Sequence, residues 1–151
     1  MDGDAATACV ACEAGYFSVP AALSCVPCEA GLADQDSNPA TECTGCSAGR
    51  FAPANASACE PCAAGMMDDD SDAATACVSC LAGWFGVLGA SSCTVCAAGR
   101  VDHDSNPSTE CIVCAAGQYS AAQALTCDMC GAGSVTETLE QGGATTCTAC
   151  G

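Results

Sequence analysis

The sequence has few large aromatic side chains. Three Phe, two Tyr and one Trp are present among 151 residues, and Ala and Cys supply most of the hydrophobic composition. Large apolar side chains contribute most of the free energy of a buried core, so a sizeable common core is excluded. Something else must hold the fold, and small modules in that position use disulfides or metal ions.

Positive charge is almost absent as well, with two Lys and Arg against 18 Asp and Glu and a formal net charge of −16. Binding to phosphate backbones needs clustered Lys and Arg, so nucleic acid is excluded as a partner. The same sign of charge argues against anionic membrane surfaces. No stretch approaches the roughly 18 apolar residues of a spanning helix, so we expect no membrane insertion of this segment.

Cysteine is the residue present in excess. The 18 cysteines among 151 residues make up about 12% of the chain, above the roughly 8–10% that marks a disulfide scaffold in a secreted chain. They form nine Cys-x-x-Cys doublets, whose spacings alternate between 16 and 18 residues until a last spacing of 20. The doublets begin at Cys9, Cys25, Cys43, Cys59, Cys77, Cys93, Cys111, Cys127 and Cys147. The true period is therefore 34 residues, made of a short and a long module.

The period divides the chain into a partial module at 1–8, four repeats and the start of a further module at 147–151. The repeats are 9–42, 43–76, 77–110 and 111–146. Both ends stop within a repeat, so we expect the sequence to be a segment of a longer array.

Every doublet except the last is followed by x-Ala-Gly. Glycine at a fixed offset from a crosslink indicates a turn with positive φ or a very close chain approach. Short modules continue with an aromatic residue, which we expect to cover the module's own disulfide as an apolar plug. These residues are Phe17, Phe51, Phe85 and Tyr119. Helical periodicity is absent. The sequence predicts a small disulfide-rich fold of irregular short β-hairpins, forming an elongated tandem-repeat rod with little hydrophobic core, in which modules contact almost only their neighbours.

Two doublets separated by 12 to 16 residues also match a four-thiolate zinc site. Zinc ribbons usually belong to intracellular and often basic modules, whereas this chain has one His and two basic residues. Disulfides are therefore favoured, and with them an extracellular or cell-surface location. Their connectivity remains open at this point, and an interleaved pairing such as Cys9–Cys25 with Cys12–Cys28 fits the spacing equally well.

The pattern Cys-x-x-Cys-x-Ala-Gly-x-aromatic-Ser, followed after about eight residues by Cys-x-x-Cys, is clearest from Cys12 through Ser18 to Cys28. It resembles the ephrin-receptor-like cysteine-rich repeats and is similar to modules of tumour-necrosis-factor receptors. Such repeats occur in long surface and filament proteins of protists and algae as well as in animal receptors. The resemblance covers the whole chain, with two departures: the strict alternation with an acidic loop, and Arg50-Phe51-Ala52, where the Ser is lost.

In the receptor modules the second Cys of one doublet bonds the first Cys of the next. The resemblance therefore implies Cys12–Cys25, Cys28–Cys43, Cys46–Cys59, Cys62–Cys77, Cys80–Cys93, Cys96–Cys111, Cys114–Cys127 and Cys130–Cys147. Cys9 and Cys150 are left to pair outside the sequence given.

Three long modules carry the acidic pattern Asp-x-Asp-x-(Asn/Asp), and two of them add a Glu just before the cysteine. The residues are Asp34, Asp36, Asn38 and Glu42; Asp68, Asp70 and Asp72; and Asp102, Asp104, Asn106 and Glu110. Alternate oxygen ligands on a tight loop are how proteins gather Ca²⁺, so calcium is the one candidate cofactor. The alternative is a turn whose side chains cap the backbone. The last long module, 136–142, lacks the pattern.

Two features indicate that the loops carry glycans or form additional hydrogen bonds. Asn55-Ala56-Ser57 is the only acceptable glycosylation sequon, because Pro follows Asn38 and Asn106, and it predicts a glycan on Asn55. A threonine recurs two residues before a cysteine, either as a loop hydrogen bond or as a carrier of O-linked glycan. These residues are Thr7, Thr41, Thr75, Thr109 and Thr145.

The regular alternation favours a structural role, as a glycosylated repeat segment of an extracellular filament, stalk or cell-surface coat. Its expected partners are neighbouring repeats, copies of itself and glycans. The alternative is a ligand-binding cysteine-rich ectodomain of a surface receptor or antigen, for which Leu81–Leu88, with Trp84, is the one candidate surface. Enzyme activity is not expected, because the only histidine, His103, lies in an acidic loop and no core exists to position a substrate.

Overall fold

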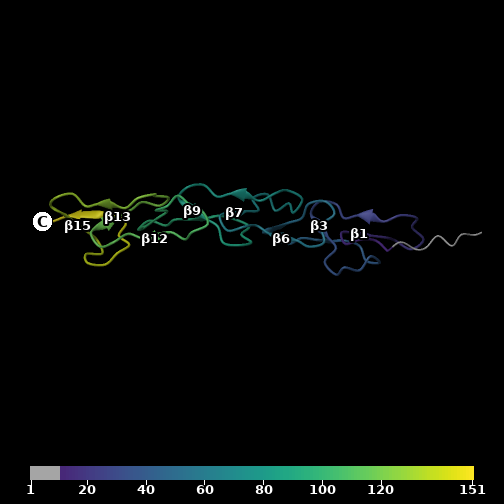
Figure 1. Ribbon diagram of the computed structural model, residues 1–151. Coiled ribbons are helices and arrows are strands. Elements are labelled where there is room, and N and C mark those ends of the chain that lie inside the picture. Colours follow the sequence, from purple (N-terminus) through teal and green to yellow (C-terminus); the bar gives the residue numbers. More distant parts are fainter. Residues whose placement is uncertain (1–10) are drawn as a thin grey trace, which may run out of the picture.

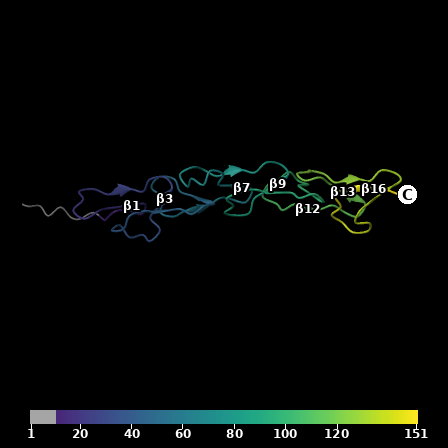
Figure 2. The same cartoon turned by 180° about the vertical axis from the view of Figure 1, so that it is seen from behind.

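The computed structural model describes residues 11–151 as an elongated series of small hairpins (Figure 1). The view from behind in Figure 2 shows the same elongated shape. Eight two-stranded antiparallel sheets each pair strands that are consecutive in the sequence. The strands are β1 (Tyr16–Phe17), β2 (Val26–Pro27), β3 (Leu32–Ala33), β4 (Thr44–Gly45), β5 (Arg50–Phe51), β6 (Glu60–Pro61), β7 (Met66–Met67), β8 (Val78–Ser79), β9 (Trp84–Phe85), β10 (Thr94–Val95), β11 (Arg100–Val101), β12 (Ile112–Val113), β13 (Gln118–Tyr119), β14 (Asp128–Met129), β15 (Ser134–Thr136) and β16 (Cys147–Ala149). The predicted rod of short, irregular hairpins is confirmed.

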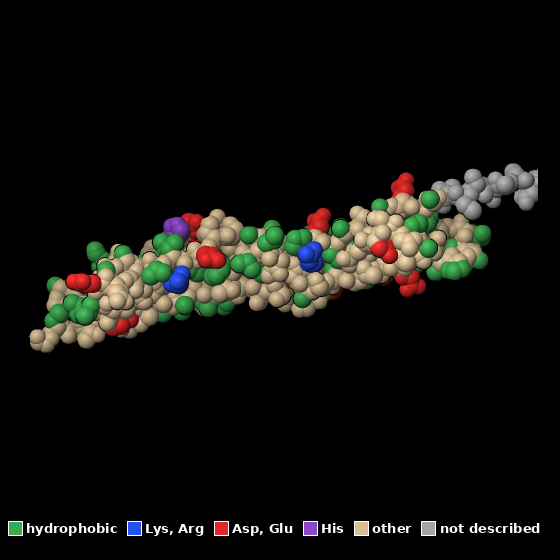
Figure 3. Space-filling view, turned by 90° about the horizontal axis from the view of Figure 1, so that it is seen from below, with side chains coloured by type: hydrophobic (Ala, Val, Ile, Leu, Met, Phe, Trp, Pro, Cys, Tyr) green, Lys and Arg blue, Asp and Glu red, His purple; other side chains and the backbone are tan. Residues whose placement is uncertain are grey.

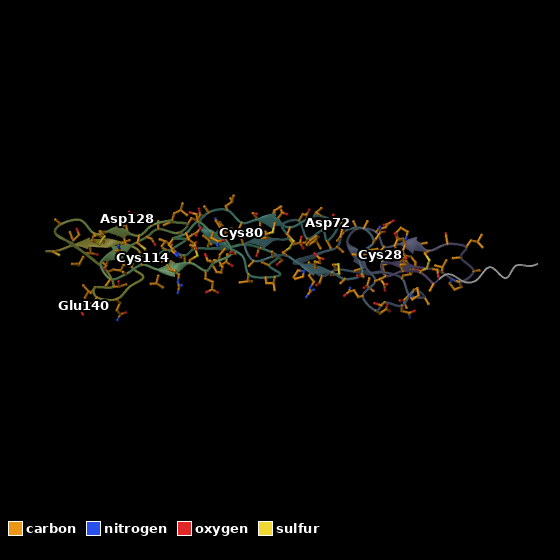
Figure 4. All side chains as sticks on the ribbon, in the orientation of Figure 1. Cys28, Asp72, Cys80, Cys114, Asp128 and Glu140 are labelled. Atoms are coloured by element: carbon orange, nitrogen blue, oxygen red, sulfur yellow. A yellow bond between two sulfur atoms is a disulfide. The ribbon has the colours of Figure 1, made fainter. Side chains whose placement is uncertain are left out.

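A disulfide closes each hairpin, and the sulfur atoms are spaced along the rod in Figure 4. The short hairpins are closed by Cys12–Cys25, Cys46–Cys59, Cys80–Cys93 and Cys114–Cys127, and the long hairpins by Cys28–Cys43, Cys62–Cys77, Cys96–Cys111 and Cys130–Cys147. These are the pairs that the resemblance implies, and they replace the interleaved alternative. Cys9 lies outside the described residues, and Cys150 is exposed and forms no disulfide within residues 11–151.

Each doublet belongs to two hairpins at once. The two residues inside the doublet Cys25–Cys28 form strand β2, while its first cysteine closes one hairpin and its second opens the next. Consecutive hairpins are therefore joined without a linker. The Ala-Gly pair that follows makes the next turn: Gly15 has φ 83°, and the N–H of Tyr16 donates to the Glu13 carbonyl oxygen at 3.1 Å. Positive φ at the third residue of a turn explains the glycine there.

The interior consists almost wholly of sulfur and methyl groups. The buried apolar residues are cysteines and alanines together with Val101. The aromatic residues are only half-buried, and Phe17 lines a shallow hollow with Cys28 and Cys43. Phe17 thus lies beside the disulfide of the following hairpin, while the expectation that each aromatic covers its own disulfide stays a prediction. Phe17 has this position because it pairs with Val26, inside the doublet that leads into that hairpin.

Neighbouring hairpins are joined by backbone hydrogen bonds. The N–H of Gly31 donates to the Ala52 carbonyl oxygen at 2.8 Å, and the N–H of Asn55 donates to the Cys28 carbonyl oxygen at 2.8 Å. Equivalent bonds recur one period later, from Gly65 to Gly86 and from Gly89 to Cys62. Each of these joints, from a long hairpin to the next short one, is therefore built from main-chain groups, which any sequence with the right turns can supply.

Hairpins also contact those two steps along the chain. The turn glycine of a short hairpin lies against the tip of the next short hairpin, and the same holds among long hairpins. The contacts are Gly15 with Asn55, Gly49 with Gly89, Gly83 with Gln123, Gly31 with Ala74, Gly65 with Ser108 and Gly99 with Gly143. The rod thus consists of two interleaved rows, one short and one long. The expectation of contacts almost only between neighbours was wrong here, because a sheet of two-residue strands is only about 7 Å long and does not separate its neighbours.

Candidate cation-binding loops and other functional sites

The first aspartate of each acidic loop is a buried structural residue. Asp34, Asp68 and Asp102 are 6%, 6% and 4% exposed. The Oδ2 atom of each accepts a hydrogen bond from the turn glycine of the preceding short hairpin, at 3.3 Å from Gly15, 3.0 Å from Gly49 and 3.0 Å from Gly83. This aspartate therefore joins a short hairpin to the next long one, a role that the Asp-x-Asp pattern alone did not reveal.

The second aspartate caps the exposed part of the loop. Asp70 Oδ1 accepts the N–H of Asp72 at 2.9 Å and the hydroxyl of Thr75 at 3.0 Å. The Asp72 N–H, and after it the Thr75 hydroxyl, lower the pKa of Asp70. The same arrangement is found at Asp36 with Asn38 and Thr41 and at Asp104 with Asn106 and Thr109. At Thr41, Thr75 and Thr109 the structure thus shows the loop hydrogen bond, whereas Thr7 lies outside the described residues.

The side chain at the third position of the pattern accepts a hydrogen bond from the backbone of its own loop. The side-chain oxygens of Asn38, Asp72 and Asn106 accept the N–H of the residue two positions on, at 3.1, 3.0 and 3.1 Å. Such bonds are typical of turns initiated by Asx residues. The alternative of a backbone-capping turn therefore describes the second and third positions of each loop, but not the buried first position.

In the last long hairpin a glutamate takes over the capping. Glu137 carboxylate oxygens accept the N–H groups of Thr145 at 2.5 Å and Thr146 at 3.0 Å. The Thr145 N–H is the main cause that lowers the pKa of Glu137 to about 2. The buried aspartate is replaced by Thr136, which is 2% exposed and donates to the Leu139 carbonyl oxygen at 3.0 Å. This hairpin keeps the turn and loses the buried carboxylate.

Among the described residues the candidate metal ligands do not gather into a cluster. The Asn106 N–H is the main cause that lowers the pKa of Asp104, and a hydrogen bond with the Asp102 side chain is the smallest of the further causes. Within residues 11–151 no group of three or more His, Cys, Asp and Glu side chains forms a metal site. The glutamates lie elsewhere: Glu42 borders the hollow beside Phe17, and Glu110 borders an equivalent hollow beside Phe85.

The predicted glycosylation site lies at a hairpin tip. Asn55 is exposed and has φ 65°, a conformation that asparagine tolerates better than most residues. Its backbone N–H is bonded to Cys28, so the tip is fixed while the side chain faces solvent. The geometry is compatible with an attached glycan.

An exposed apolar hollow lies on the third short hairpin. A hollow of about 300 Å³ is lined by Met67, Leu81 and Trp84, with Ser79, Ser92 and Cys93. Leu81 is 75% exposed, and Leu88 on the same hairpin is 68% exposed. Figure 3 shows that on the face in view apolar side chains form small groups scattered over a mostly uncharged surface.

No model of a known protein family matches the chain, and no curated protein matches it either. Among the described residues no helix is long and apolar enough to cross a membrane. The eight disulfides indicate that the protein folds in an oxidising compartment, as secreted and extracellular proteins do.

Proposed function

We propose that this chain is a non-catalytic structural segment of an extracellular filament, stalk or cell-surface coat. Its partners are neighbouring repeats and copies of itself, with a glycan on Asn55. The observation that carries the proposal is the contact between a turn glycine and the hairpin tip two steps along, which recurs in both rows from Gly15 to Gly143. A surface devoted to one ligand would not need the same joint at every step.

The two kinds of joint make a stiff rod. Each hairpin is hydrogen-bonded to the next one and touches the one after that, so bending the chain at any doublet disturbs contacts on both sides. The formal charge of −16 adds repulsion between acidic loops, which favours extension and keeps rods apart in solution. Stiffness and spacing are the properties that a filament or coat requires.

The proposal includes membership of the cysteine-rich repeats that resemble ephrin-receptor and tumour-necrosis-factor-receptor modules. The disulfide ladder supports it, because the second cysteine of each doublet bonds the first cysteine of the next. The strict alternation of short and long hairpins then distinguishes this chain from modules that vary along a receptor.

Localisation tests the proposal directly. Antibodies raised against the folded, oxidised chain are applied to the cells that make it, and bound antibody is imaged by immunogold electron microscopy. We expect continuous or regularly spaced labelling along an extracellular filament, stalk or coat. Labelling confined to the cell interior, or to isolated patches of plasma membrane without any filament or coat, would contradict a structural role.

A ligand-binding ectodomain is the second candidate, favoured by the exposed surface around Trp84. If this surface binds a protein ligand, Leu81→Ser, at an exposed residue that lines the hollow, weakens capture of that ligand from the extracellular medium at least tenfold. The matched control is Leu23→Ser, because Leu23 is fully exposed on a hairpin without this hollow. Equal capture by both variants and the unchanged chain would remove this candidate.

A further inference from the structure

Each hairpin places a disulfide in parallel with its own loop. In the first described hairpin the chain enters at Cys12 and leaves at Cys25, and these residues are bonded to each other with their Cα atoms 5.6 Å apart. A pull along the chain from Cys12 to Cys25 therefore acts on the disulfide. The loop between the two cysteines cannot lengthen while that bond holds, whatever happens to the hydrogen bonds within the loop.

Between two disulfides the chain consists of a single doublet. Val26 and Pro27 follow Cys25, and Cys28 then opens the next bonded loop. These two residues form strand β2. Residues in a strand already advance by about 3.3 Å each, close to the limit of a fully extended chain. A doublet therefore has almost no slack to release under tension.

The same covalent path runs through the described chain from Cys12 to Cys147. Its eight disulfides hold Cα atoms 5.6–5.8 Å apart, and the doublets between them contain β2, β4, β6, β8, β10, β12 and β14. Figure 4 labels Cys28, Cys80 and Cys114, which lie on this path in order along the rod. The path measures about 120 Å, whereas the same stretch of chain without disulfides would extend to about 470 Å.

Noncovalent contacts alone would not hold this length. The sheets consist of strands of two or three residues, and an isolated two-stranded hairpin is at best marginally stable in water. The interior, mostly cysteine and alanine, adds little burial. A domain held by a hydrophobic core lengthens when a pull unfolds it. In this chain the noncovalent contacts set the shape, while the disulfides and doublets set the greatest length.

We propose that this chain is a load-bearing tether of nearly fixed length, in which tension passes through the disulfides and doublets and bypasses the loops. The loops lie beside the path, so the acidic turns and the Asn55 tip carry none of the load. An extended surface can thus be kept in place while the rod is pulled. The tether deepens the structural role proposed above, and it rests on that role for the source of the tension.

Each disulfide also stores a fixed length of chain. Four of the bonds have a sequence separation of 13, three have 15 and one has 17. Breaking one of them under tension releases about 40, 47 or 54 Å respectively. Such a bond is broken when a thiolate attacks one of its sulfur atoms. With dithiothreitol, the protein disulfide gains two electrons and two protons to give two thiols, and the reagent becomes a cyclic disulfide.

The test is single-molecule force spectroscopy on the full, oxidised chain, held by its two termini. Without reductant we expect no step that lengthens the chain by about 40 Å or more. With dithiothreitol at constant force we expect steps in three sizes, in the proportions four, three and one. Together these steps should add about 350 Å of contour length.

The double variant Cys96→Ser with Cys111→Ser opens one loop without any reductant. Its contour length should exceed that of the unchanged chain by about 47 Å, and this holds whether or not the opened hairpin still folds. Cys150→Ser is the matched control and should leave the length unchanged, because within residues 11–151 Cys150 has no disulfide partner.

Two results would overturn the tether. One is a step of about 40 Å or more in the oxidised, unchanged chain before reductant is added, because a loop would then have carried load. The other is a double variant no longer than the unchanged chain. Neither result bears on where the protein is found: absence of label from extracellular filaments, stalks and coats would contradict the proposed function and leave the load path intact.

Discussion

Turn glycines carry the contacts between hairpins of one row, and two of them have the same backbone and different surroundings. Gly83 and Gly133 both have φ 80°. A Cβ atom on Gly83 would lie 2.5 Å from the Gln123 carbonyl oxygen, whereas a Cβ atom on Gly133 would meet nothing within 4 Å. Substituting each of these two glycines therefore separates the free energy lost from the turn conformation from the free energy lost from the contact between hairpins.

Gly83→Ala should destabilise the chain more than Gly133→Ala. Both variants place alanine in the left-handed region, at a cost of about 1–2 kcal/mol. Gly83→Ala also forces its methyl group into the neighbouring tip, which adds about 1–3 kcal/mol. Chemical denaturation of the two oxidised variants measures the difference. Equal losses of stability would show that the glycines serve the turns alone and that the two-row packing contributes nothing.

Glu137 gives a prediction about pH. Its pKa is lowered from 4.5 to about 2, chiefly by the Thr145 N–H. Because the folded pKa lies below the unfolded one, its contribution to stability is complete above about pH 4.5 and is lost as the pH falls to about 2. The amide resonances of Thr145 and Thr146 should titrate with a midpoint near 2. A midpoint near 4.5 would contradict the bonded loop, and in Glu137→Gln the titration should vanish.

At the scale of the hairpin, the disulfide replaces a core. Strands of two or three residues and interiors of cysteine and alanine provide little burial, so the crosslink must limit the freedom of the unfolded loop. Each doublet contributes one cysteine to each of two consecutive hairpins. Breaking the disulfide of one hairpin therefore also weakens the contacts that its neighbours make.

Replacing Cys96 and Cys111 together by Ser should destabilise the chain by about 3 kcal/mol, because the bond closes a loop with a sequence separation of 15. Protease should then cut first within 96–111, and next in 130–147, which packs on Gly99 through Gly143. The control is Cys150→Ser, which removes an exposed cysteine that has no disulfide partner within residues 11–151. Cleavage spread evenly over the doubly substituted chain would contradict the view that each hairpin is closed by its own bond.

Much of this element-level structure could be predicted from the sequence. The 34-residue period and the fixed Ala-Gly pair indicated repeated hairpins with tight turns, because a glycine beside a crosslink is needed where φ is positive or where two chains approach closely. The partner of each glycine could not be predicted, since a need for close approach does not say which chain comes close. Asp34 and Asp36 also looked equivalent in the pattern, and only packing against Gly15 buries one and leaves the other exposed.

At the scale of the whole molecule, the two rows explain why short and long hairpins alternate so strictly. The turn glycines from Gly15 to Gly99 each meet a tip of their own row. The two kinds of joint between consecutive hairpins also differ. From a long hairpin to the next short one, the N–H of Gly31 donates to the Ala52 carbonyl oxygen. From a short hairpin to the next long one, the N–H of Gly49 donates to the Asp68 side chain. A long hairpin therefore fits after a short one, and the unit that can be added or removed is the pair.

Deleting one pair should be tolerated, and deleting one hairpin should not. Removal of 43–76 joins Glu42 to Cys77 and places Gly86 beside Gly31, where it can accept the bond that it already accepts from Gly65. Removal of 43–58 joins Glu42 to Cys59, sets two long hairpins in succession and leaves Asp68 without Gly49. Both deletions remove an even number of cysteines, so every remaining disulfide can form.

We expect the 34-residue deletion to keep the denaturation midpoint of the full chain and to give a shorter rod by small-angle X-ray scattering. The 16-residue deletion should unfold at lower denaturant concentration, and its fastest hydrogen exchange should lie at the joint between the two long hairpins, where a buried aspartate has lost its donor. Equal midpoints for the two deletions would mean that hairpins stack without regard to type. The rows would then be a consequence of the sequence repeat and not its physical cause.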